Sequence, residues 1–132
     1  MSFIFIIKAS PKSPISNNTQ VHNFHDLGLK VAYLEGNAVK RIEGLDNLVN
    51  LRSLYLQENL ICKIEGLECL INLVNLNLSD NQISVVEGLK NLTKLQNLQI
   101  KRNRIGGNGI ADLQGLLECP TISALDISDN HI

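Results

Sequence analysis

Five asparagines recur along this chain at an almost constant interval. Asn37, Asn59, Asn81 and Asn103 follow one another at steps of 22 residues, and Asn130 follows after 27. Each lies in the same apolar frame, with apolar residues 8, 5 and 3 positions before the asparagine and 2, 5 and 8 positions after it. A repeat of this length predicts a solenoid, because one coil cannot bury its apolar side alone whereas stacked coils share a continuous core.

The apolar frame also predicts the shape of each coil. It is clearest in LRSLYLQENLICKIEGL at 51–67 and LVNLNLSDNQISVVEGL at 73–89. The period-two alternation before the asparagine predicts a short strand with one buried face, and the wider spacing after it predicts a return segment of turns. Because every coil runs the same way, the strands should form a parallel sheet. The predicted fold class is α/β, a right-handed solenoid with the sheet on its concave face and 3₁₀ or short helical turns on its convex face.

The recurring asparagines have the chemistry of a structural residue. The chain turns sharply after each strand, which leaves backbone polar groups without partners in the sheet. A buried asparagine offers one carbonyl acceptor and two N–H donors to such groups. We therefore expect a structural asparagine ladder rather than a ligand site, formed by Asn37, Asn59, Asn81, Asn103 and Asn130.

The length of 132 residues predicts one domain with two segments. In the N-terminal segment, residues 1–23, Phe5 and Ile7 stand five and three positions before Ser10, as in a degenerate coil. This segment is either a capping strand followed by a loop or a flexible tail, and its apolar run FIFII favours the strand, which would cover a sheet edge. Residues 24–132 form the repeat domain, with about five coils, the last of them incomplete.

The last two repeats depart from the frame. An insertion within RIGGNGIADLQGLLEC at 104–119 places apolar residues at helical spacing, which predicts a true helix on the convex side. The residues at that spacing are Ile110, Leu113, Leu116 and Leu117. The terminal coil has Ile122, Leu125, Ile127 and Ile132 at core positions. No polar cap follows this coil, which favours a fragment of a longer protein over a face that pairs with another molecule.

The outward strand positions are the candidate binding surface. Tyr33 and Tyr55 occupy one column on adjacent strands about 4.8 Å apart, so their rings can stack. Exposed tyrosines are favoured binding anchors, and cross-strand packing is an equally good interpretation. Glu35, Glu58 and Asp80 flank this patch on one side, and Lys101, Arg102 and Arg104 form a basic island on the next coil. These charges either orient a partner with matching charges or are ordinary solvated charges. The candidate partner-binding residues are Tyr33, Tyr55, Asn77, Gln99, Lys101, Arg102 and Asp126.

Composition excludes several functions and indicates no catalytic site, metal or cofactor. The net charge of −1 does not favour binding to nucleic acid or to an anionic membrane. The start, MSFIFIIK, is too short for a signal peptide or a membrane span. Three cysteines match no metal spacing and are expected to be reduced thiols, with Cys119 in the core. The histidines lack partners at ligand spacing, and an enzyme is not expected.

The repeat form IxxIEGLxxLxxLxxLxLxxN resembles the Sds22-like subclass of leucine-rich repeat proteins. Within that subclass, the runs LEGN, LQENLICKIE and LNLSDN are similar to the dynein axonemal assembly factor 1 family, over about residues 24–132. This resemblance implies a cytoplasmic adaptor, in ciliated or flagellated cells, for dynein chains or co-chaperones during preassembly of axonemal dynein arms. The chain departs from the family at Gly44, Gly66 and Gly88, where the family usually has asparagine, in its degenerate first coil, and in lacking the C-terminal coils and tail.

Two other functions stay open at this point. One is a regulatory subunit of a serine/threonine phosphatase, as Sds22 proteins are. The other is a leucine-rich repeat scaffold of an RNA-processing complex that contacts protein rather than RNA. For all three functions we expect protein partners, no direct contact with nucleic acid or membrane, and a monomer or a weak dimer through the terminal coil. The expected location is the cytoplasm, with a cilium or flagellum as the specific setting.

Overall fold

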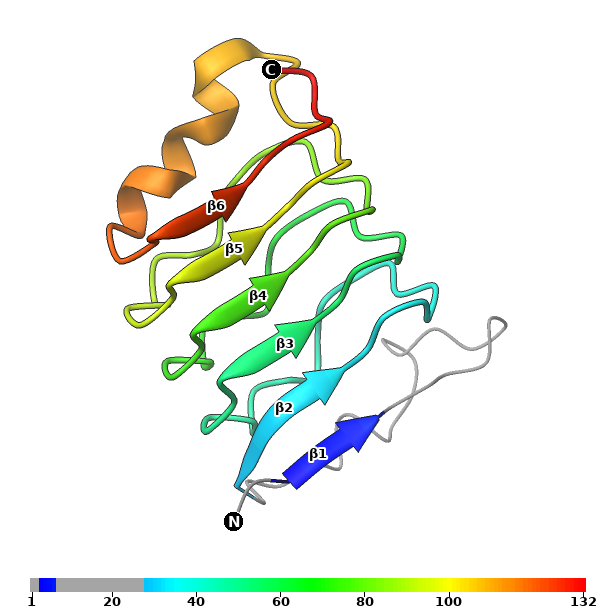
Figure 1. The fold of residues 1–132 in the computed structure, drawn as a ribbon, viewed down its shortest axis with the longest axis vertical. Helices are drawn as coiled ribbons and strands as arrows, with labels where there is room; N and C mark the ends of the chain where they lie inside the picture. Colours follow the sequence, from blue (N-terminus) through cyan, green and yellow to red (C-terminus); the bar gives the residue numbers. More distant parts are fainter. Residues whose placement is uncertain (1–2, 7–27) are drawn as a thin grey trace.

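The computed structural model describes residues 3–6 and 28–132, which form a stack of parallel strands (Figure 1). The sheet has six strands in the order of the sequence, β1-β2-β3-β4-β5-β6, and each strand pairs in parallel with the next. The strands are β1 (Phe3–Ile6), β2 (Leu29–Tyr33), β3 (Ser53–Tyr55), β4 (Asn75–Asn77), β5 (Asn97–Gln99) and β6 (Ala124–Asp126). This arrangement confirms the predicted parallel-sheet solenoid.

The strands align at the positions that the repeat predicts. The residue five positions before each ladder asparagine pairs with its counterpart on the next strand, from Ala32 through Leu54, Leu76 and Leu98 to Leu125. Because side chains alternate between the two faces of a strand, this register keeps the whole column on the face that covers the core.

Strand β1 joins the sheet at the edge of β2. Phe5 aligns with Ala32, and Ile6 aligns with Tyr33. This is the register predicted for the degenerate coil, in which Phe5 takes the position that Ala32 takes in the next coil. The rest of the N-terminal segment, and the boundary predicted after residue 23, lie outside the described residues.

One continuous core lies behind the sheet. In the coils that carry Asn37, Asn59 and Asn81, every predicted core residue is at most 3% exposed. The terminal coil differs from the prediction, because Leu125 is 40% and Ile132 66% exposed. Its other predicted core residues, Ile122 and Ile127, are only partly buried. The physical reason is the stacking itself, since a coil is covered only where a neighbouring coil lies on both sides.

Tight turns form most of the convex side. In the coil after β2, Leu48 N–H donates to Leu45 O at 2.9 Å and Leu51 N–H donates to Leu48 O at 3.0 Å. The same pair of bonds recurs in the next coils, from Leu70 and Leu73. Bonds that span three residues are the pattern of 3₁₀ structure, so these segments agree with the predicted turns.

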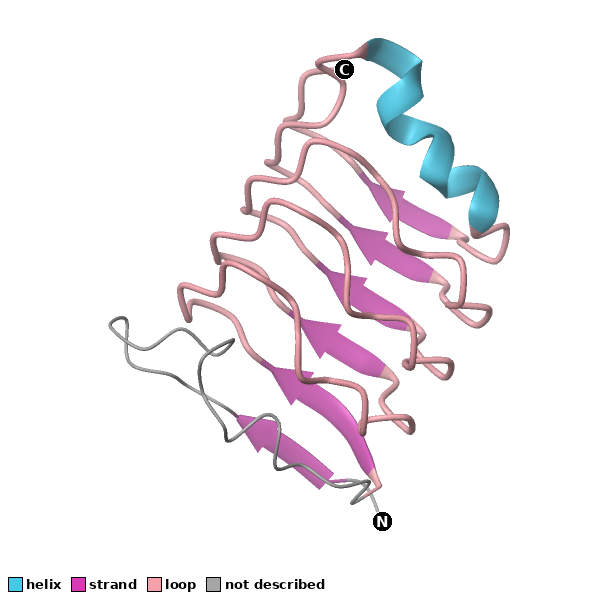
Figure 2. Cartoon of the chain, turned by 180° about the vertical axis from the view of Figure 1, so that it is seen from behind, coloured by secondary structure: helices cyan, strands magenta, loops and turns pink. Residues whose placement is uncertain are grey.

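The predicted true helix is instead a 3₁₀ helix, η2 (Gly109–Glu118), at the C-terminal end of the stack (Figure 2). With three residues per turn, Leu113 and Leu116 line up and pack against the core. Ile110 and Leu117 were expected on the same face, but they are 82% and 83% exposed. The helix lies close to the preceding coil, since a Cβ on Gly115 would stand 2.0 Å from Val86 O.

A buried carboxylate closes the loop before η2. Asp112, only 3% exposed, accepts hydrogen bonds from the N–H groups of Gly106 at 3.1 Å and Asn108 at 3.0 Å. The bond from the Asn108 backbone is the main cause that lowers the pKa of Asp112. The carbonyl of Asp112 also accepts the N–H of Val86 at 2.8 Å, which ties the inserted helix to the coil before it.

The asparagine ladder joins each coil to its predecessor. Asn59 Oδ1 accepts the N–H groups of Asn37 at 2.9 Å and Val39 at 3.0 Å. Its Nδ2 donates to Leu34 O in the preceding coil at 3.0 Å and to Leu56 O in its own coil at 2.9 Å. Corresponding bonds join Asn81 to Ile61, Asn103 to Ile83, and Asn130 to Ile105.

Glycine recurs seven residues after the first three ladder asparagines for a steric reason. Gly44, Gly66 and Gly88 have φ values of 76°, 72° and 70°. A Cβ on Gly66 would lie 2.3 Å from Ile42 O, the carbonyl of the preceding coil. Coil spacing as well as the left-handed backbone therefore requires glycine here.

Asn81→Leu should lower the unfolding free energy by about 1–3 kcal/mol or more, because it removes the partners of the Ile61 N–H and of two buried carbonyls. Urea unfolding followed by circular dichroism measures the change. The control is Asn91→Leu, since Asn91 is exposed and makes a single exposed bond to Glu68 O. Equal losses in both variants would contradict a structural role for the ladder.

Gly66→Ala should lower the unfolding free energy by at least about 1–3 kcal/mol, the cost of a strained left-handed backbone, with the contact to Ile42 O in addition. Gly107→Ala is the matched control, because a Cβ at Gly107 meets nothing within 4 Å. Thermal unfolding of both variants gives the comparison. A midpoint for Gly66→Ala equal to that of the control would show that the coils are spaced more widely.

Candidate protein-interaction surface

The outward-pointing residues of β2–β6, together with the two residues before each ladder asparagine, form one surface, which we call the open face. Its central row is a set of residues aligned across neighbouring strands, one from each coil. The row consists of Tyr33, Tyr55, Asn77, Gln99 and Asp126. The first three are half-buried, and the last two are exposed. The structure thus brings five of the seven candidate residues into a single line.

The two tyrosines of the row stack on each other. Their ring centroids are 5.0 Å apart, and the planes differ by 6°. The prediction that these rings stack is confirmed. Stacking fixes both rings on the face, and their half-buried state leaves part of each ring open to solvent.

A second row holds the amides beside the tyrosines in place. Asn75 Nδ2 donates to Ser53 Oγ at 3.0 Å, and Asn97 Nδ2 donates to Asn75 Oδ1. Ser53 is only 8% exposed, although the sequence placed it among the outward positions. The polar side chains of this row therefore support one another and keep fixed orientations.

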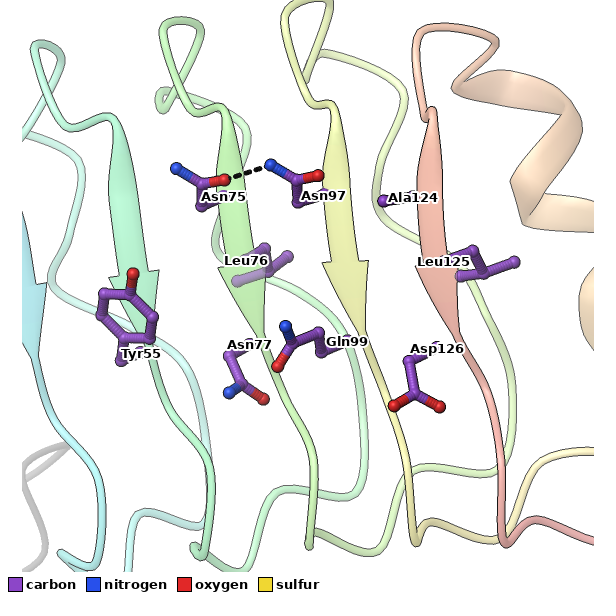
Figure 3. Close-up of a pocket in the computed structure, with 9 residues that line it drawn as sticks. All are labelled: Tyr55, Asn75, Leu76, Asn77, Asn97, Gln99, Ala124, Leu125 and Asp126. Carbon is purple, nitrogen blue, oxygen red and sulfur yellow. Dashed lines mark hydrogen bonds between the residues drawn. The ribbon is translucent and has the colours of Figure 1, made fainter.

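A groove of about 280 Å³ runs across β4–β6, next to Tyr55 (Figure 3). Its polar lining includes Asn77 and Gln99, with Asp126 at the far end. Ala124 stands where the preceding strands carry Asn75 and Asn97 in the lining. Amide side chains both donate and accept hydrogen bonds, so this lining can pair with the polar groups of a peptide backbone.

The carboxylate at the end of the groove is held by a serine. Asp126 Oδ1 accepts the Ser128 hydroxyl at 2.6 Å and the Ser128 N–H at 3.0 Å. The bond from the Ser128 hydroxyl is the main cause that lowers the pKa of Asp126. Lys101 and Arg102 lower this pKa further through their charges.

In the basic island, aspartates pair with two of the three members. Arg102 Nη2 donates to Asp80 Oδ2 at 3.0 Å, and Arg102 Nε donates to Asp80 Oδ1. Lys101 Nζ lies 4.0 Å from Asp129 Oδ2. Asp80 and Arg102 each stand one position before a ladder asparagine, so the stacking of successive coils brings these opposite charges together. Only Arg104 of the three lacks an ion pair among the described residues.

Two features of the open face were missed from the sequence. Glu58, Asp80, Arg102 and Asp129, each just before a ladder asparagine, have φ values between 51° and 58°. Gly36 at the same position of the first coil was the available signal. The second feature is a pair of buried oxygens, Oε2 of Glu35 and Oε1 of Gln57, that have no hydrogen-bond partner. No repeat pattern reports the pairing of individual side-chain atoms.

The cysteines and the described acidic residues form no metal site. Cys62 and Cys69 are exposed, and Cys119 is buried with its Sγ 3.5 Å from Leu92 O. Among residues 28–132, no three His, Cys, Asp or Glu side chains are grouped so that they could hold a metal ion. In the same part of the chain, no helix is long and apolar enough to cross a membrane.

Comparisons with known proteins identify the repeat. A family model described as Leucine Rich repeats (2 copies) matches residues 28–69, and a Leucine Rich Repeat model matches residues 72–92. Among curated proteins, none matches the chain significantly. The solved structure of an internalin (inlF) from Listeria monocytogenes is similar, with a TM-score of 0.72, 24% identity, and coverage of 98% of this chain and 42% of that one.

A second solved structure from Listeria monocytogenes, an internalin C2 (inlC2), gives the same result. Its TM-score is 0.72 at 27% identity, and the match covers 96% of this chain and 51% of that one. The chain thus spans about half, or less, of the length of these two structures. The likeness to the first internalin, at 24% identity, is a likeness of fold alone.

Arg102→Gln should raise the pKa of Asp80 toward its ordinary value, because the Arg102 hydrogen bond is the main cause that lowers it. A lowered folded-state pKa contributes stability above the unfolded pKa, and this stability is lost as the pH falls through the folded value. The variant should therefore be less stable than wild type at neutral pH, and the two should converge in acid. Carboxyl-carbon NMR titration of Asp80 measures the shift. Arg104→Gln, the control, should leave that titration unchanged.

Proposed function

We propose that this chain, which belongs to the leucine-rich repeat proteins, binds protein partners on its open face and acts as a non-enzymatic adaptor. Leucine-rich repeat solenoids present a long surface on which other proteins dock. The observation that carries the proposal is the stacked pair of Tyr33 and Tyr55 beside the polar groove. Aromatic anchors next to polar groups that can pair with peptide are typical of binding hot spots.

The rigidity of the open face supports binding without a large ordering cost. Its side chains project from strands that the asparagine ladder locks together. Several of the polar groups are already oriented, such as Asn75 by Ser53 and Asp126 by Ser128. A surface that is organised before binding loses less conformational freedom when a partner arrives.

The specific setting that we propose is cytoplasmic preassembly of axonemal dynein arms in ciliated or flagellated cells. The support is the sequence resemblance in the runs LEGN at 34–37, LQENLICKIE at 56–65 and LNLSDN at 76–81. Each run includes open-face positions as well as a ladder asparagine, so the likeness extends beyond the residues that build the fold. Dynein chains or their co-chaperones are then the expected partners.

One observation favours a second candidate, a regulatory subunit of a serine/threonine phosphatase. Gly44, Gly66 and Gly88 resemble Sds22 proteins at a position where the assembly-factor family usually has asparagine. A phosphatase catalytic subunit would then bind the same open face. The RNA-processing scaffold has no comparable observation in its favour.

Replacing both tyrosines by alanine should weaken partner binding by about tenfold or more, because such anchors contribute a large share of the binding energy. The unfolding free energy should fall by about 0.5–1.5 kcal/mol for the lost ring pair, in addition to the contribution of the area that the half-buried rings cover. Affinity capture from a flagellated cell, read by mass spectrometry, compares wild type with Tyr33→Ala/Tyr55→Ala. The control is Lys63→Ala/Lys90→Ala, which changes two exposed residues of the return segments.

Dynein chains and chaperones that are captured by wild type and control, and lost with the tyrosine variant, would support the assembly role. A phosphatase catalytic subunit in the same pattern would move the assignment to the second candidate. Splicing proteins would move it to the RNA-processing scaffold. Equal capture by all three proteins would contradict binding through the open face.

A further inference from the structure

Two buried acceptors on neighbouring coils have no donor. Oε2 of Glu35 and Oε1 of Gln57 are covered from solvent, and neither has a hydrogen-bond partner. Both residues stand two positions before a ladder asparagine, and the N–H of Gly36 donates to Gln57 O at 3.2 Å between them. Buried polar atoms in native proteins are nearly always paired, so an unpaired couple at one place needs an explanation.

The aspartates of the open face, by contrast, have partners. Asp80 is paired with Arg102, Asp126 accepts from Ser128, and Asp129 lies near Lys101. The ion pairs among the described residues do not include Glu35. The lack of a donor is therefore specific to the coils of Glu35 and Gln57 and is not a general property of this surface.

The unpaired acceptors lie beside the tyrosine stack. Glu35 follows Tyr33 by two residues, and Gln57 follows Tyr55 by two residues. Both residues lie just past the ends of β2 and β3, where hydrogen bonds between the coils continue from Leu34 N–H to Tyr55 O and from Gly36 N–H to Gln57 O. Alternate residues of such an extended backbone point to the same face and are separated by about 7 Å. One side chain of a partner can therefore contact a ring and an acceptor at the same time.

The chemistry of this corner of the open face fits a cation with several N–H donors. A carboxylate and an amide oxygen accept hydrogen bonds, and a tyrosine ring attracts a positive charge to its face. An arginine guanidinium is planar, carries five N–H donors and stacks on aromatic rings, so one group meets all of these demands. A lysine ammonium is a compact charge that does not stack in this way.

We propose that Glu35 and Gln57, together with the stack of Tyr33 and Tyr55, form a subsite for an arginine side chain of the protein partner. The proposal rests on the proposed function, because it assumes a partner on the open face. Both Glu35 and Gln57 are half-buried residues, so part of each side chain reaches the surface. Rotation about their last torsions, which have broad energy wells, turns an oxygen toward the incoming guanidinium.

The test is selection of a random dodecapeptide library on the wild-type chain, followed by affinity measurements with the selected peptides. We expect enrichment of arginine. Replacing that arginine by citrulline, which has the same shape without the charge, should lower the affinity about tenfold or more, and so should Glu35→Gln. Glu68→Gln, the matched control, removes the same charge from an exposed residue of a return segment and should leave the affinity unchanged.

The outcomes separate this inference from the proposed function. Peptides that need Tyr33 and Tyr55, yet lack arginine or bind Glu35→Gln as tightly as wild type, would overturn the arginine subsite and leave binding on the open face intact. Selected peptides whose binding ignores the tyrosines as well would overturn both.

Stability of the free chain gives an independent readout. If Glu35 lacks a donor, Glu35→Gln should leave the thermal midpoint unchanged or raise it, because no internal bond is lost. A clear fall of the midpoint would show that Glu35 is already paired within the chain, and it would overturn the proposal. If Glu35 had a purely structural role, Glu35→Gln would lower the thermal midpoint and would leave the preference for arginine in the selected peptides unchanged.

Discussion

The hydrogen bonds of the asparagine ladder are the interaction on which the rest of the structure depends. Each strand has only a few residues, so the chain must turn at once and bring buried backbone groups to the turn. The amide of Asn59 satisfies two N–H groups and two carbonyls there. Without such a residue the leucines could still collapse, but the turn would bury unpaired groups, and the coils would not keep one spacing.

That spacing determines the other features of the coil. Because the coils lie at a fixed distance, Gly66 has no room for a Cβ against Ile42 O. The same distance brings Tyr33 onto Tyr55, and Arg102 onto Asp80. The open face is thus a set of side-chain columns, and each column is as regular as the core behind it.

The sequence predicted most of the fold because its repeat specifies backbone register. Leu54, Leu76 and Leu98 were expected in one buried column, and they pair there. The tyrosine stack followed from the same register. Prediction was weaker where the repeat is broken, since the inserted segment forms a 3₁₀ helix, and Ile110 and Leu117, both expected on its core-facing side, are exposed.

Side-chain pairing on the open face was also beyond the repeat pattern. The repeat pattern predicts which residues of successive coils lie side by side. It does not predict that Arg102 donates to Asp80 or that Oε2 of Glu35 has no donor. These outcomes depend on rotamers and on a few ångströms of distance. Side-chain pairing decides which charges are neutralised within the chain and which can bind a partner. The details of the candidate site could therefore be identified only from the structure.

The ladder bonds also have a direction. Each ladder amide that joins two coils reaches only toward the coil before it, as Asn59 does to Val39 and Asn81 does to Ile61. Loss of one coil therefore leaves the N–H groups of its predecessor without their asparagine acceptor, whereas the ladder amide of its successor loses the groups that it bonds in the lost coil. Fraying that starts at the C-terminal end should thus remove hydrogen bonds from the next coil inward at every step, so that opening propagates from this end. Opening from the N-terminal end breaks a different set of bonds, because the N–H groups of Leu60 and Gln82 then lose the carbonyls of Val39 and Ile61 in the preceding coil. The two ends of the solenoid therefore open by the loss of different bonds.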